Sequence, residues 1–267
     1  MRMVLKRMAG MIDIQNNHSG RLIYICQLLF VLFSVSQAGN AWSAAPVLVL
    51  NNVTNAPYTT EQHDGFLDVI TTLAFHRAGL NLKLIKQPAE RGLQNANTGK
   101  IDGDLTRIKN IQDIYPNLVR IPEKLMDWEF AAFSNNRHIL TDWQTITSHS
   151  VGFIKGWKIY EHKTRGVHAI TVANTPLQLF RLLHLGRVNS VLYEKWQGLE
   201  KSRAFSSLNN DIHVKTLEKR PMYIYLNKRH KKYIEKINSS LKALKQDGVY
   251  TAEYNKRVLP YLKEAMK

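Results

Sequence analysis

The stretch VLVLNNVTNAPYTTEQHDGFLDVITTLAFHRAGLNLKLI, residues 47–85, predicts a strand, a helix and a second strand in succession. Residues 47–53 form an apolar, β-branched run that ends in turn residues, which is typical of a buried strand. Apolar residues between Phe66 and Phe75 then recur at helical spacing, and Gly79 closes that segment. Residues 82–85 complete a β-α-β unit as a second, short strand.

The alternation of strands and helices continues beyond residue 85. Pro88 opens a helix that Gly99 ends, which matches the preference for proline at the start of a helix and glycine just past its end. Residues 101–106 supply the third strand. The order β-α-β-α-β favours a parallel sheet with right-handed crossovers.

A second series of elements follows in the middle of the chain. Strands are predicted at residues 150–154, 168–172 and 187–193. Thr175 and Pro176 provide the N-cap and first residue of a helix that Gly186 terminates. A further helix stops near Gly248 and carries on one face Tyr233, Ile234, Ile237, Leu241 and Leu244. We therefore expect an α/β protein built from two units of ordinary domain size.

The stretch RLIYICQLLFVLFSVSQAGNAWSAAP, residues 21–46, predicts export. A basic residue precedes an apolar run, and small residues follow it, which is the order of a secretory signal peptide. We interpret residues 1–45 as a cleavable signal peptide and expect a periplasmic protein; a retained membrane anchor is the alternative. The only cysteine, Cys26, lies in this leader, so the mature chain is expected to contain no disulfide.

The chain is strongly basic, with 37 Lys and Arg residues against 21 Asp and Glu and a formal net charge of +16. Nucleic acid is the common partner of such a chain, but the export signal argues against it. Two interpretations stay open: a solvated basic surface near anionic lipids or cell-wall polymers, and long-range attraction of an anionic ligand.

Sequence motifs of catalysis are absent. The chain has no Gly-x-Ser-x-Gly turn, no phosphate-binding glycine-rich loop and no His-Glu-x-x-His pair. Its histidines are scattered without the spacing of metal ligands. We therefore expect no metal, no cofactor and no enzymatic activity.

Five segments in order resemble family 3 periplasmic solute-binding proteins, and together they extend over the predicted mature chain. They are Asn55 to Tyr58 (NAPY), Gly99 to Arg107 (GKIDGDLTR), Val151 to Trp157 (VGFIKGW), Leu182 to Glu194 (LLHLGRVNSVLYE), and a closing region that contains IYLNK and INSSLKALKQDGVYTAEYNK. No single segment is a strong motif, and the resemblance depends on their order.

The resemblance implies a type 2 periplasmic-binding-protein fold, with two α/β lobes joined by two hinge strands and a ligand trapped by closure. Lobe one would comprise residues 46–134 and 222–267, and lobe two residues 135–221. The crossings would fall near residues 133–136 and 221–225. The helix after Arg229 would pack on the lobe that contains Tyr58, and the protein would be a monomer.

The resemblance also implies candidate ligand contacts. In amino-acid binders of this family an arginine pairs with the ligand carboxylate, because a guanidinium fork matches a carboxylate. Arg107 is the candidate here and Arg91 the second. Glu194 would accept the ligand ammonium. Three further candidates would line the cleft: the aromatic side chains of Tyr58 and Trp157, and Gly156 in the turn of lobe two.

The resemblance implies a protein that captures a small polar solute, an amino acid or a related carboxylate, for a membrane importer or a membrane sensor. Three departures weaken the amino-acid assignment: the segment between Asp102 and Arg107 is short and lacks a Thr-x-x-Arg, Asn189 replaces the aspartate usual in the Gly-Arg-Val-Asp element, and Glu194 is longer than the aspartate usual at its position. The first alternative is a dehydratase- or lyase-like enzyme on the same scaffold, with Glu194 or Asp104 as acid or base. The second is a sensor or adhesion module without a ligand.

Overall fold

The computed structural model describes residues 44–206 and 212–265 of the chain. Residues 1–43, which include Cys26 and most of the predicted signal peptide, lie outside this part of the chain. The strands follow one path, β2-β1-β3-β9-β5-β8-β6-β7, with β4 also paired to β9. We describe this path as a first sheet, which contains β1 to β4, and a second sheet, which contains β5 to β8; β9 belongs to both.

The first sheet confirms the predicted β-α-β-α-β order. Its parallel strands are β1 (Val47–Asn51), β2 (Asn81–Ile85) and β3 (Gly103–Arg107), and the connecting helices are α2 (Phe66–Arg77) and α3 (Ala89–Thr98). β4 (Leu118–Arg120) and the C-terminal end of β9 (His213–Asn227) add antiparallel strands at the other side of β3. β1 lies between β2 and β3, so its buried residues Leu48 and Leu50 belong to the core.

The second sheet contains the predicted middle series. β6 (Val151–Ile154) pairs in parallel with β7 (Ile170–Ala173) and β8 (Ser190–Glu194), whereas β5 (Met126–Ser134) is antiparallel to β8. β8 begins three residues later than predicted. The Arg187 N–H donates to the Leu182 carbonyl, so Arg187 belongs to the end of the preceding helix and not to the strand. The flanking helices are α4 (Trp143–Thr147), α5 (Lys158–Lys163), α6 (Pro176–His184) and α7 (Lys195–Ser206).

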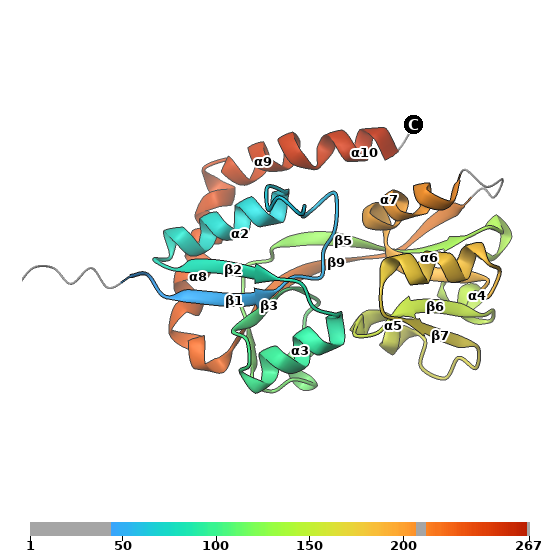
Figure 1. Ribbon diagram of the computed structural model, residues 1–267, viewed down its shortest axis with the longest axis horizontal. Helices are drawn as coiled ribbons and strands as arrows, with labels where there is room; N and C mark the ends of the chain where they lie inside the picture. The colour runs from blue at the N-terminus through green and yellow to red at the C-terminus, as the bar shows by residue number, and fades with distance from the viewer. Residues whose placement is uncertain (1–43, 207–211, 266–267) are drawn as a thin grey trace, which may run out of the picture. The chain divides into compact units, whose positions relative to one another are not determined.

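β5 and β9 run side by side from one sheet to the other (Figure 1). Met222 in β9 still pairs with β5, and Tyr223 pairs with Arg107 of β3, so β9 changes partner within the predicted crossing at residues 221–225. β5 already pairs with β8 at Phe130, which precedes the predicted crossing at residues 133–136. The division into lobes at residues 134 and 222 stays a proposal.

The chain beyond Arg229 packs on α2. Phe66 makes edge-to-face contacts with Tyr250 and Tyr254, at ring-centre distances of 5.0 and 5.4 Å. These tyrosines lie in α9 (Val249–Arg257), which follows α8 (Ile234–Gln246) and precedes α10 (Leu259–Ala265). The sequence-based helix that included Tyr233 is wrong at its start, because a 3₁₀ turn (Lys228–Tyr233) precedes α8.

Two helix ends show how the local sequence sets the fold. Thr175 caps α6 as predicted, since its hydroxyl accepts a hydrogen bond from the Gln178 N–H at 3.2 Å, and Pro176 starts the helix. Asp142 caps α4 in the same way through the Thr145 N–H. In the two described ranges, no helix has both the length and the apolar character needed to cross a membrane.

Candidate functional site

The loop after β1 meets the end of β8, and this contact joins the two sheets. The Asn55 side-chain amide donates to the Tyr193 hydroxyl at 3.2 Å, and the Asn55 N–H donates to the Gln197 Oε1 at 2.9 Å. The Tyr58 hydroxyl donates to the Glu194 Oε1 at 3.2 Å. Polar side chains at strand ends therefore come together where open α/β sheets bind ligands.

Glu194 is completely buried at this contact. Its carboxyl accepts hydrogen bonds from Tyr58 and from both the backbone N–H and the side chain of Gln197. Burial raises the pKa of Glu194 to about 7, although the Gln197 hydrogen bonds oppose that rise. The carboxyl therefore takes up a proton near neutral pH, and its hydrogen bonds go to the protein itself.

We expect Glu194→Gln to flatten the pH dependence of stability. The folded protein keeps the Glu194 proton up to about pH 7, whereas the unfolded chain releases it near pH 4.5. Wild type should therefore lose roughly 3 kcal/mol of unfolding free energy from this group as the pH rises through that window. Urea unfolding at about pH 5 and about pH 8 measures the difference between variant and wild type.

Glu200→Gln is the matched control, because Glu200 lies on α7, the helix that directly follows Glu194, but has a partly exposed side chain. Its effect on the unfolding free energy should be the same at both pH values. A difference between Glu194→Gln and wild type that does not grow with pH would contradict a buried, neutral Glu194.

Arg107 is buried at the end of β3 and already has a charged partner. Its Nε and Nη2 donate to the two carboxyl oxygens of Asp104 at 2.8 and 2.9 Å, and Nη2 also donates to the Ala89 carbonyl. Burial raises the pKa of Asp104, against the lowering effect of the Arg107 charge. The fork predicted to hold a ligand carboxylate thus holds a carboxylate of the protein.

Gly156 lies against the first sheet's α3. Its φ is +87°, and a Cβ at this position would come 2.8 Å from the Ala89 carbonyl carbon and closer still to the Glu90 backbone nitrogen. Next to it, Lys158 of α5 donates to Glu90 at 2.7 Å and to Glu161 at 2.8 Å. Glu90 also accepts from the Tyr115 hydroxyl. Gly156 therefore permits the turn before α5 to lie close to α3, and the Lys158–Glu90 ion pair stabilises this contact.

Tyr58 and Trp157 belong to one buried aromatic stack. Trp128 of β5 stacks on Tyr58 with ring centres 6.3 Å apart, and on Trp157 with ring centres 5.5 Å apart. Trp157 also contacts Tyr160 and Tyr193. The two predicted aromatic residues are thus brought together, and Trp128, which was not predicted from the sequence, joins them.

Arg91, the second predicted arginine, is exposed on α3, and no ion pair joins it to any residue in the described ranges. Asn189, which replaces the expected aspartate, has a structural role: its Oδ1 accepts hydrogen bonds from the backbone N–H and the hydroxyl of Ser150. No group of three or more His, Cys, Asp or Glu side chains within residues 44–206 and 212–265 could hold a metal ion.

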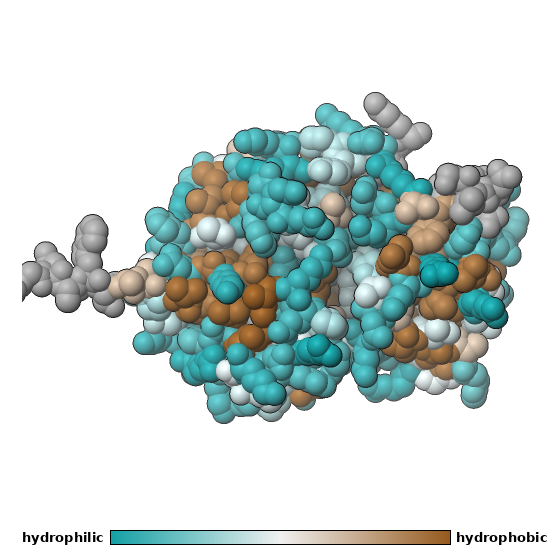
Figure 2. Space-filling model, viewed as in Figure 1, coloured by the Kyte–Doolittle hydropathy of each residue, from teal (hydrophilic) through white to brown (hydrophobic). Residues whose placement is uncertain are grey.

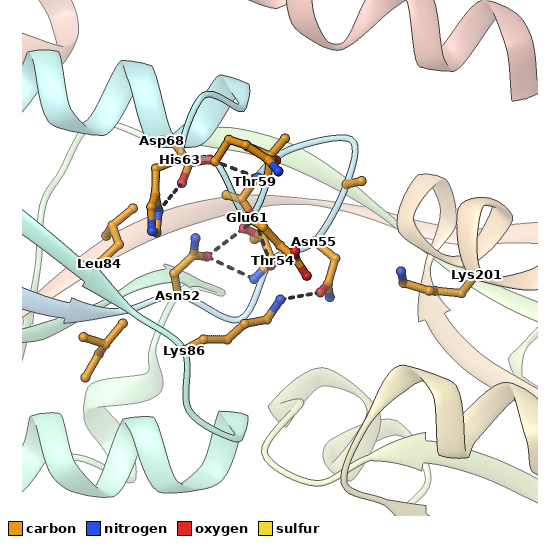
Figure 3. Close-up of a pocket in the computed structure, with 14 residues that line it drawn as sticks. Asn52, Thr54, Asn55, Thr59, Glu61, His63, Asp68, Leu84, Lys86 and Lys201 are labelled. Atoms are coloured by element: carbon orange, nitrogen blue, oxygen red, sulfur yellow. Dashed lines mark hydrogen bonds and ion pairs between the residues drawn. The ribbon is translucent and has the colours of Figure 1, made fainter.

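A large hollow at these strand ends has a volume of about 520 Å³ and is drawn in Figure 3. The loop after β1 supplies Asn52, Thr54 and Asn55, β2 ends in it with Leu84 and Ile85, and Lys86 follows. Lys201 extends toward it from α7 on the opposite side. Burial and the nearby Lys201 charge lower the pKa of Lys86, whose amine donates to Asn55 at 2.6 Å.

Two smaller cavities lie nearby. One, of about 230 Å³, shares Asn55 and Lys86 with the large hollow and extends to Trp157 and the N-terminus of α6. The other, of about 20 Å³, is lined by Arg107, Trp128, Gly156 and Trp157 among others. Figure 2 shows a mostly hydrophilic surface over the region where the two sheets meet, with apolar areas over β1–β2 and α6–β7.

Comparison with known proteins identifies the fold. No protein-family model matches the chain. An uncharacterised protein of Shewanella oneidensis is 26% identical over 235 residues, which cover 83% of this chain and 89% of that protein.

Solved structures are similar over most of the described chain. An ancestral arginine-binding protein bound to glutamine superposes with a TM-score of 0.67 at 18% identity, over 79% of this chain and 97% of that one. A histidine kinase sensor domain with similarity to periplasmic binding proteins superposes with a TM-score of 0.70 at 14% identity, over 80% of this chain and 97% of that one. The chain has the periplasmic-binding-protein fold. This confirms the fold class expected from the five sequence segments.

Within the periplasmic-binding-protein fold, three residues at the junction of the sheets were not predicted from the sequence: Trp128, Lys86 and Gln197. Trp128 could have been found, because the apolar residues of MDWEF at positions 126, 128 and 130 alternate with Asp127 and Glu129, as in a strand. Lys86 and Gln197 carry no such signal. Their side chains are significant only because the fold brings them to Asn55.

Proposed function

We propose that this protein is a non-catalytic solute-binding protein that captures a small polar solute between two lobes. The observation that carries the proposal is the pair of hollows at the strand ends, one of which is bordered by Asn55 from the loop after β1 and by Lys201 from α7 beside the second sheet. Small-molecule sites in α/β folds occur at such strand ends. The fold it shares with amino-acid-binding proteins and with a sensor domain supports the same function.

The solute is an amino acid or a related carboxylate. Lys86 and Lys201 support an anionic group of the solute, and Glu61 and Asp68, which line the same hollow, support a cationic one. The carboxylate contact that the resemblance implies for Arg107 requires the guanidinium to be shared with Asp104. The ammonium contact implied for Glu194 requires the carboxyl to leave Tyr58 and Gln197.

The leader at residues 21–46 supports export to the periplasm. There the protein delivers its solute to a membrane importer or signals through a membrane sensor, and it acts as a monomer without a cofactor. Contacts between the sheets, such as the Lys158–Glu90 ion pair, act as the closing contacts around the solute.

The second candidate is an enzyme on the same scaffold. The pKa of Glu194, raised by burial to about 7, would suit an acid or base at neutral pH. Against this reading, Glu194 is fully buried, hydrogen-bonded to Tyr58 and Gln197, and does not line any of the three hollows described above. Turnover of a bound compound that is abolished in Glu194→Gln would favour the enzyme.

Thermal melting of the purified protein with a panel of L-amino acids and matching simple carboxylates tests the proposal. A solute that binds only the folded state raises the melting temperature, and at a hundred times its Kd it contributes about 2.7 kcal/mol. Lys201→Met should weaken a carboxylate ligand roughly fivefold, or by about 1 kcal/mol. Lys242→Met, on the exposed side of α8, is the control. A panel without any stabilising compound would contradict solute binding.

A further inference from the structure

The smallest of the three hollows is lined by two residues whose buried polar groups lack hydrogen-bond partners among the described residues. This cavity of about 20 Å³ lies between the end of β3, β5 and the turn into α5. Thr106 and Trp128 line it, and each is only 1% exposed. Among the described residues, neither the Thr106 hydroxyl nor the Trp128 Nε1 has a hydrogen-bond partner. Buried polar groups in folded proteins are nearly always hydrogen-bonded, so this pair indicates a missing acceptor.

The chemistry of the two groups limits what the acceptor can be. An indole Nε1–H can only donate a hydrogen bond, and a threonine hydroxyl can donate one as well. A single oxygen that accepts from both would satisfy them. A second donor or a hydrocarbon group would leave the indole unsatisfied.

The charges around the cavity are already paired. Arg107 forms its two-point contact with Asp104, and Lys158 contacts both Glu90 and Glu161. The cations that line the cavity therefore have three acidic partners. A ligand carboxylate placed here would meet the repulsion of those carboxylates, whereas an uncharged oxygen would not.

The volume of the cavity fits one small group. A cavity of this size holds about one water-sized group. Trp157 lines this cavity and also the neighbouring hollow of about 230 Å³. A solute could thus place an end group in the small cavity and keep its remaining atoms outside it.

We propose that Thr106 and Trp128 bind an uncharged oxygen of the solute, the carbonyl oxygen of an amide or a related group, and select it over a carboxylate at this position. The proposal rests on the proposed function, since it requires a solute to bind between the two sheets. The solute oxygen in the small cavity is then recognised by two neutral donors, Thr106 and Trp128. Arg107 does not contact it and instead holds Asp104 in place.

Nitrogen-15 NMR of the purified protein, titrated with acetamide or with acetate, tests this proposal. The two probes have similar size and differ in charge. The Trp128 indole N–H signal is assigned by its loss in Trp128→Phe. Acetamide should shift this signal and acetate should shift it much less. Thr106→Val should weaken the acetamide effect about tenfold, since it removes one hydrogen bond from a buried site.

Thr71→Val is the matched control, because Thr71 is equally buried but its hydroxyl donates to the Leu67 carbonyl at 2.5 Å. Without a probe, Thr106→Val should keep or raise the melting temperature, and Thr71→Val should lower it. An equal loss in both variants would mean that a fixed water satisfies Thr106, and would overturn the proposal.

Two other results would also overturn it. Acetate could shift the Trp128 signal more than acetamide does, and Arg107→Lys could abolish that shift. The small cavity would then recognise a negative charge, and the protein would still bind a solute but without the proposed selectivity for an uncharged oxygen. If neither probe shifts the signal, the two donors do not contact a ligand oxygen. In that case the melting panel decides the solute-binding function separately.

Discussion

Arg107→Ala is expected to lower the free energy of unfolding by about 3–5 kcal/mol, because it leaves the buried Asp104 without its charged partner. Asp104 is 0% exposed, and Arg107 contacts both of its carboxyl oxygens. The loss should appear in urea unfolding near neutral pH. It should shrink at acidic pH, since burial raises the pKa of Asp104 and a protonated Asp104 no longer needs the cation.

Two variants make this result specific. Arg77→Ala breaks an equally short ion pair, at 2.7 Å to Asp247, but both partners are well exposed, so it should cost far less stability than Arg107→Ala. Asp104→Asn combined with Arg107→Met removes both buried charges and should recover much of the loss. An Arg107→Ala protein no less stable than Arg77→Ala would contradict the buried pair.

Gly156→Ala is expected to separate the two sheets at their contact and to abolish solute binding. The added Cβ would come within 2.8 Å of the Ala89 carbonyl carbon, and a backbone cannot move aside as the end of a flexible side chain can. The turn before α5 must then leave α3, which breaks the Lys158–Glu90 ion pair. Small-angle scattering should show a larger radius of gyration, and a solute that stabilises wild type should no longer raise the melting temperature.

Gly166→Ala is the control that distinguishes the effect of the Gly156 contact from the effect of backbone strain. Gly166 has nearly the same φ, +86°, but a Cβ there would meet nothing within 4 Å. Its substitution should cost only the strain of a left-handed residue, about 1–2 kcal/mol. It should leave both scattering and solute binding unchanged. Equal behaviour of the two variants would show that the Gly156 contact does not hold the sheets together.

The order of strands and helices could be predicted because it depends on local signals. The apolar run at residues 47–53, the proline and glycine that bound α3, and the Thr175 cap all act over a few residues. β9 carried a weak signal, since charged residues interrupt it and Pro221 lies within it. Its pairing with β5 and β3 could be known only from the assembled sheet.

The Asp104–Arg107 pair shows why the site could not be predicted in the same way. In a regular strand, residues three apart point to opposite faces, so an aspartate at 104 would not be expected to hold an arginine at 107. A shift of register between these two residues in the pairing with β9 accompanies their contact. The sequence therefore predicts an arginine at the end of this strand, but its partner depends on an irregularity of the sheet.

The position of β9 has a consequence for the order of events during synthesis. β3 and β4 depend on residues 223–227 for their antiparallel neighbour, and β5 depends on residues 213–222. Neither sheet can be completed until this late segment has left the ribosome. Before then, the edges of β3 and β5 that later pair with β9 have no neighbouring strand. Such unpaired edges favour aggregation, so a chain that stops before residue 213 should depend on chaperones to stay in solution.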